Sequence, residues 1–126
     1  IATQTTICAI ATGSPASAAQ NAAVIFPTVS SDTTGSYSNS TGKYTAPIGG
    51  RYLVNSTVNG TNVGQYNLYV NNSSTIVLGF ANSSGQMTGS QIVSVLAGDT
   101  IHVGTSHASG TGANGTSSVS FLRVGN

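Results

Sequence analysis

Aromatic residues separated by turn-forming residues dominate the chain between Phe26 and Val54. Phe26, Tyr37, Tyr44 and Tyr52 follow one another at intervals of seven to eleven residues, with Gly, Pro, Asn and Asp between them. Aromatic side chains favour strands, whereas the intervening residues bend the backbone within a few positions. The pattern therefore predicts short β-strands joined by tight turns.

Apolar residues at every second position extend this prediction beyond Val54. Residues 51–58 place Tyr52, Val54 and Val58 on one face of a strand, and Ser56 interrupts that face. The segment 24–26 is expected to form an earlier strand, and residues 1–12 alternate loosely enough to open the sheet.

The next segment reads as a hairpin. Tyr66 and Leu68 share one face of a predicted strand, and Tyr69 lies on the opposite face. Asn71-Asn72 suits the turn because Asn tolerates positive φ. Tyr69 is then placed either against a neighbouring subunit or against the second sheet of the same sandwich.

The C-terminal third contains three more predicted strands. The run 91–96 is dense in apolar residues, which suggests a strand covered on both faces. The last of these strands has Phe121 as its expected core anchor. The strands cover residues 91–96, 100–103 and 118–124, and a further one precedes them at 76–80.

Closely spaced strands without intervening helices predict an all-β antiparallel sandwich. At 126 residues the chain is expected to form one domain, 1–126, with residues 1–20 as a candidate N-terminal strand or arm. Loops are expected at 13–17, 82–85 and 104–117, where Gly, Ser, Thr and Asn gather.

Charge is scarce in this chain. Only 4% of residues are charged, against about 25% in an average globular protein, and the formal net charge is +1. The three bases, Lys43, Arg51 and Arg123, are too few and scattered for nucleic-acid binding. No apolar run approaches the roughly 18 residues that span a bilayer. Copies of such a surface do not repel one another, which favours self-association.

The spacing from Phe26 onward resembles the signature of the C1q/tumour-necrosis-factor-like jelly-roll family. In that signature a Phe is followed after five residues by Asp or Asn, then by two aromatics and a Gly-x-Tyr that opens a core strand. Here Phe26 and Asp32 have this spacing, and Gly50-Arg51-Tyr52 matches the Gly-x-Tyr. Tyr44 stands where Phe is usual, and Val and Ser replace later aromatics. The resemblance covers roughly residues 20–124 and implies a trimer-forming jelly-roll head that binds or displays rather than catalyses.

Catalytic groups are few. Asp32 and Asp99 are the only acids, so a paired-carboxylate glycosidase would have to use both. Cys8, the single cysteine, lies among apolar residues, which favours a small buried hydrophobe over a reactive thiol. An intermolecular bridge through Cys8 is the alternative. We therefore predict no enzyme and no cofactor.

Metal binding receives weak support from Asp99, His102 and His107. Positions 99 and 102 point to opposite faces of an extended strand, and His107 falls in a predicted loop. Three copies of His102 around a three-fold axis would supply three imidazoles. The alternative is a solvent-facing or interface histidine with an ordinary hydrogen bond, and we predict no metal site.

The candidate site residues fall into two groups. Large side chains on strands are expected in the core or the trimer interface: Tyr37, Tyr44, Tyr52, Tyr66, Tyr69, His102 and Phe121. Polar side chains in predicted loops are expected to contact a receptor: Asn59, Asn62, Asn82, His107 and Asn114. Seven Asn-x-Ser/Thr sequons are attributed to composition, and they begin at Asn39, Asn55, Asn59, Asn71, Asn72, Asn82 and Asn114.

Three functions fit these residues. The first is a trimeric structural or attachment module on a virion or phage fibre, with itself as partner, other virion or surface proteins nearby, and a host glycan or protein as receptor. The second is a bacterial extracellular coat or filament protein. The third is a secreted lectin-like or ligand domain. All three place the chain on a virion surface or outside the cell.

Overall fold

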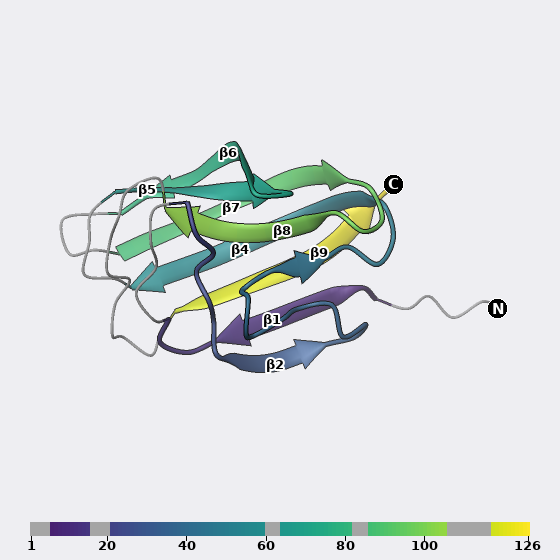
Figure 1. The fold of residues 1–126 in the computed structure, drawn as a ribbon, viewed down its shortest axis with the longest axis horizontal. Coiled ribbons are helices and arrows are strands. Elements are labelled where there is room, and N and C mark those ends of the chain that lie inside the picture. Colours follow the sequence, from purple (N-terminus) through teal and green to yellow (C-terminus); the bar gives the residue numbers. More distant parts are fainter. Residues whose placement is uncertain (1–5, 16–20, 60–63, 82–85, 106–116) are drawn as a thin grey trace.

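The structure is a computed structural model that describes residues 6–15, 21–59, 64–81, 86–105 and 117–126. Two antiparallel sheets pack face to face (Figure 1). The first sheet has the order β2-β1-β9-β4-β7, and the second has the order β3-β8-β5-β6. The strands are β1 (Cys8–Thr12), β2 (Thr28–Asp32), β3 (Tyr44–Thr45), β4 (Gly50–Asn59), β5 (Gln65–Val70), β6 (Ser73–Phe80), β7 (Gln86–Val95), β8 (Thr100–Thr105) and β9 (Ser118–Gly125).

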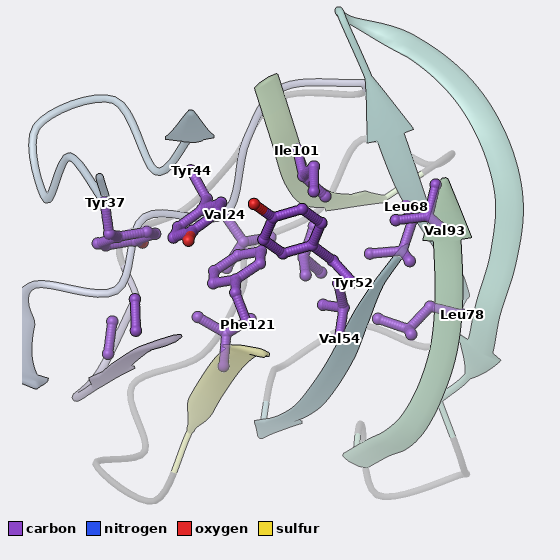
Figure 2. Close-up of a cluster of buried hydrophobic side chains, with 14 of the residues drawn as sticks. Val24, Tyr37, Tyr44, Tyr52, Val54, Leu68, Leu78, Val93, Ile101 and Phe121 are labelled. Carbon is purple, nitrogen blue, oxygen red and sulfur yellow. The ribbon is translucent and has the colours of Figure 1, made fainter. Parts of the chain in front are cut away.

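The core lies between the two sheets and confirms the predicted sandwich. Tyr44 stacks on Phe121 with ring centroids 4.7 Å apart and 10° between planes, and Tyr52 meets Tyr44 at 5.7 Å. Figure 2 shows these rings side by side with aliphatic residues from both sheets. Aromatic pairs of this kind add about 0.5–1.5 kcal/mol beyond the area that they bury. The aromatic spacing in the sequence is therefore the spacing of inward-pointing positions.

Two tyrosine hydroxyls of the core find partners, and two do not. The Tyr52 hydroxyl donates to the carbonyl of Ile48 at 2.7 Å, and the Tyr37 hydroxyl accepts from the amide of Phe26 at 3.1 Å. The hydroxyls of Tyr44 and Tyr66 are buried without a hydrogen bond. Burial raises the pKa of Tyr44 to about 12. These phenols therefore act as large apolar groups at neutral pH.

The β5–β6 turn forms as predicted. Asn71 and Asn72 have φ values of 52° and 67°, in the left-handed region that Asn tolerates. Asn71 Nδ2 donates to Asp99 Oδ1 at 3.0 Å, and Asn71 Oδ1 accepts from the amide of Thr100 at 3.0 Å. This asparagine ties the hairpin to the turn before β8.

Two strand predictions were wrong. Residues 24–26 form no strand: Val24 makes one backbone hydrogen bond to Val103, and the neighbouring Ala23 makes an isolated bridge to Gly104. The run 91–96 is not covered on both faces: Ile92 is 54% exposed and Leu96 is 73% exposed. The reason is that Ile92 lies on the outward face of β7, and Leu96 follows the end of that strand.

A segment that we call the strap, Asn21–Phe26, runs from the end of β8 to the start of β2 (Figure 1). It pairs with the edge of β8 beyond the point where β3 ends. Val24 and Phe26 point into the core and are 0% and 1% exposed. The strap therefore joins the two sheets as well as covering an edge.

Candidate functional site

The outer face of the five-stranded sheet is exposed, and we call it the open face. Its register places side chains in rows that cross β1, β9, β4 and β7. The first row is apolar and the next two are mainly hydroxyl and amide. The rows are Cys8–Leu122–Leu53–Ile92, Ile10–Ser120–Asn55–Ser90 and Thr12–Ser118–Thr57–Thr88.

Two shallow depressions lie on the open face. The larger, about 490 Å³, is lined by polar groups, including Asn55, Thr88 and Ser90. The smaller, about 250 Å³, is mainly apolar and is lined partly by Cys8, Ile10 and Leu122. The face thus offers an apolar zone beside a hydrogen-bonding zone.

The three rows of the open face contain no charged side chain. The next outward position on β4 is Arg51, which is exposed at the end of the strand. Burying these rows against a partner would therefore desolvate hydroxyls and amides but no ion, and burying ions is the larger cost. Surfaces depleted of charge at their centre are typical of subunit interfaces.

The seven strand residues predicted for the core or interface are all buried within one subunit. Their exposed fractions run from 0% for Tyr44 and Tyr52 to 7% for Tyr37. Tyr66 and Leu68 face the core and Tyr69 faces the opposite side, as the alternation predicts. None of the seven offers a side-chain surface to a second copy in this structure.

Tyr69 and His102 lie in an arrangement that the sequence did not reveal. Tyr69 points to the outer side of the four-stranded sheet, so its placement against the second sheet was wrong. Its ring stacks on His102 with centroids 4.7 Å apart and 5° between planes. Its hydroxyl donates to Asn21 Oδ1 in the strap at 2.8 Å.

His102 is 1% exposed, so the expectation of a solvent-facing or interface histidine was wrong. Neither ring nitrogen has a hydrogen-bond partner. Burial, with a smaller effect of the Lys43 charge, lowers the pKa of His102 to about 4. The described residues contain no group of three His, Cys, Asp or Glu side chains that could hold a metal ion.

The predicted receptor-binding loops are only partly described. Asn59 is the last residue of β4 and is 7% exposed, so its placement in a surface loop was wrong. Its backbone amide donates to Ser117 Oγ at 3.0 Å. The remaining candidates lie outside the described residues: Asn62, Asn82, His107 and Asn114.

Cys8 is half-buried beside Leu122 on the open face, so it is not the buried core residue that we expected. The reason is strand parity, since Ala9 and Ala11 take the inward positions of β1 and leave Cys8 and Ile10 outward. None of the described segments forms a helix long and apolar enough to cross a lipid bilayer.

Comparison with known proteins settles the family. A model of the C1q domain matches residues 8–122. The chain belongs to the C1q domain family. No curated protein matches the sequence.

Solved structures share the fold of this C1q domain. The globular domain of zebrafish complement 1qA protein aligns with a TM-score of 0.66 and 17% identity over 98% of this chain and 100% of that chain. Eiger TNF from S. frugiperda aligns with a TM-score of 0.74 and 14% identity, over 98% of this chain and 95% of that chain. Pika GITRL aligns with a TM-score of 0.64 and 17% identity, over 95% of this chain and 98% of that chain. At these identities the likeness shows the fold.

The family assignment confirms the C1q/TNF-like jelly roll and the absence of an enzymatic role. C1q/TNF-like domains are non-enzymatic binding modules, usually form homotrimers and are generally extracellular. What the sequence did not reveal in this C1q domain is the open face. The sequence did contain a signal for this face. Leu53 and Leu122 are apolar, yet they alternate with residues that already point into the core, so they must point outward.

Proposed function

We propose that this C1q domain is a non-enzymatic homotrimeric binding module that associates through the open face. The observation that carries the proposal is the uncharged set of rows on that face, with an apolar row at its edge. Ile92 is 54% exposed and Ile10 is 41% exposed in the single subunit. Apolar side chains exposed in one region of a face are a common mark of an association surface.

The two zones of the open face are also expected to make this association selective. The apolar row contributes burial, and the adjoining Asn, Ser and Thr rows need matching hydrogen-bond partners. A surface with two zones of this kind discriminates between registers, because a shifted partner leaves amides and hydroxyls unpaired.

The test is the mass in solution at micromolar concentration. The subunit mass is 12.5 kDa, so multi-angle light scattering should give three times that, about 37 kDa. Ile92→Lys places a charge in the apolar row and should shift the mass to that of a monomer. Val77→Lys is the matched control, because Val77 is an exposed apolar residue of β6 in the other sheet. A monomeric wild-type protein, or equal loss in both variants, would contradict the proposal.

The setting that we propose is the surface of a virion or phage fibre, where trimers gain avidity from many weak contacts with a host glycan or protein. The scarcity of charge supports it, since such a surface packs against copies and neighbouring structural proteins without repulsion. Binding of the purified trimer to intact particles or host cells tests this setting. Binding to a glycan array without particle association would instead favour a secreted lectin-like ligand.

A further inference from the structure

His102 lies beneath the Asn21 end of the strap, whereas Val24 and Phe26 fix the other end of the strap in the core. The strap is joined to β8 by two backbone hydrogen bonds, from Asn21 to the carbonyl of Thr105 at 2.8 Å and from Val24 to the carbonyl of Val103 at 2.7 Å. By contrast, β8 pairs with β5 at five consecutive positions. Local opening occurs first where the fewest interactions must break.

The strap closes over the same outer face on which His102 lies. Gly104 follows His102 by two residues and shares its face of β8. A Cβ built on Gly104 would lie 2.7 Å from the Tyr69 ring and 2.9 Å from the carbonyl oxygen of Ala22. The start of the strap therefore presses directly on this face, and Asn21 reaches the Tyr69 hydroxyl across it.

The surroundings of His102 suit a neutral ring and not a charged one. Neither ring nitrogen has a hydrogen bond of good geometry, although the backbone of Asn21 lies near enough to favour the charged ring slightly, and Tyr69 offers its ring face. An imidazolium has two N–H donors, and leaving them unpaired in a buried site is costly. The backbone of Asn21 in the strap raises the pKa of His102, but by less than burial lowers it.

Charged groups around His102 oppose its protonation. Lys43, just before β3, lowers the pKa of His102 further. On β5 the neighbour is the ring of Tyr69, which stacks on the imidazole. Asp99 precedes β8, but its carboxylate accepts from Asn71 and from the amide of Leu96. No carboxylate among the described residues hydrogen-bonds to the ring.

We propose that His102 is an acid-sensitive latch: its protonation stabilises an open state in which the start of the strap has left the edge of β8 and the outer face of the four-stranded sheet is uncovered. The proton arrives from water once the strap opens, and the open state exposes both ring nitrogens to solvent. Because the closed state admits no proton easily, acid shifts the population toward the open state.

The size of the shift follows from the difference in proton affinity. The pKa of His102 is about 4 in the closed state, against an ordinary value of 6.5 when the ring is solvated. The opening constant should therefore rise about tenfold for each pH unit below 6.5, and about 300-fold in all by the time the pH is well below 4. The latch works across a mildly acidic range.

Hydrogen exchange of the two strap amides tests the latch. Protection factors of Asn21 and Val24, corrected for the intrinsic exchange rate at each pH, should fall from pH 7 to pH 4.5. Amides of the β5–β8 ladder should stay more strongly protected than the two strap amides at every pH in this range. Equal protection of the strap and ladder amides would mean that the strap opens only by global unfolding and would overturn the proposal.

Substitutions at the two histidines assign the effect. His102→Phe keeps an aromatic ring against Tyr69 but cannot titrate, so strap protection should become independent of pH. His107→Gln is the matched control and should behave like the wild type. Should His102→Phe not fold, the imidazole of His102 in the wild type can be titrated by NMR. A midpoint between 6 and 7, or a pH dependence that survives His102→Phe, would overturn the latch.

Discussion

The two sheets of this C1q domain differ in what their outer faces meet. On the open face, outward residues such as Ile92 are more than half exposed. On the outer side of the four-stranded sheet, which we call the covered face, Asn67, Tyr69 and His102 are 4%, 1% and 1% exposed. The same alternation of side chains therefore yields one face available to a partner and one that is packed within the subunit around Asn67, Tyr69 and His102, although Val77 on β6 stays exposed.

The largest expected effect compares the inner and outer sides of one strand. Phe121→Ala removes a ring that packs on Tyr44 and Tyr37, and should lower the free energy of unfolding by about 3–5 kcal/mol. Leu122→Ala changes the next residue, which faces outward, and should cost about 1 kcal/mol in a dissociated subunit. Urea unfolding at low protein concentration measures both. Equal losses would show that the open face is packed like the core.

The core could be predicted from the sequence because it depends on local order. Tyr52, Val54 and Phe121 are inward residues, and alternation within a strand is enough to identify them. Outward residues are harder to interpret. A dense apolar run such as 91–96 has the same composition whether a second layer covers it or a second copy meets it. The prediction that the strand containing Ile92 is covered on both faces was wrong for this reason.

The covered face could not be predicted because it depends on pairing between distant segments. Asn21 meets Tyr69 from 48 positions away, and Ala23 pairs with Gly104. Neither contact follows from periodicity, since both need the strap to pass along the edge of β8, a segment far from it in the sequence. The two-residue β3 leaves that edge free, and a strand so short gives almost no sequence signal.

Acid should weaken the molecule through the covered face and not through the open one. The pKa of His102 is lowered to about 4 in the folded state from 6.5, so the unfolded chain binds more protons between these values. Stability is therefore complete above pH 6.5 and falls as the pH drops, by about 3 kcal/mol in total near pH 4. Urea unfolding at pH 7, 5.5 and 4.5 measures this slope, and His102→Phe should flatten it.

Asp99 provides the internal contrast for this titration. Hydrogen bonds from Asn71 and from the Leu96 amide lower the pKa of Asp99 below 3.8. Its contribution is therefore present above pH 3.8 and is lost only as the pH falls below that value. An acid transition that begins below pH 4 and persists in His102→Phe would assign the effect to carboxylates instead.

Gly104→Ala should loosen the strap at neutral pH. The added Cβ would meet the Tyr69 ring at 2.7 Å and the Ala22 carbonyl at 2.9 Å, so we expect a loss of about 1–3 kcal/mol. Gly125→Ala is the matched change on the five-stranded sheet. There the nearest group is the flexible Arg51 guanidinium at 3.1 Å, which can move aside. Similar unfolding free energies for both variants would show that the covered face is not tightly packed at Gly104.

Tyr69→Phe isolates the side-chain hydrogen bond that, within the described part of the chain, links the strap to the covered face. It removes the hydroxyl that donates to Asn21 Oδ1 at 2.8 Å and keeps the ring that stacks on His102. A loss of about 1 kcal/mol is expected, equivalent to roughly fivefold faster exchange of the Asn21 amide. Tyr52→Phe removes a comparable bond, to the carbonyl of Ile48, and should leave strap exchange unchanged. If Tyr69→Phe does not change Asn21 protection, the strap is held by its backbone pairing alone, and the covered face closes without side-chain help.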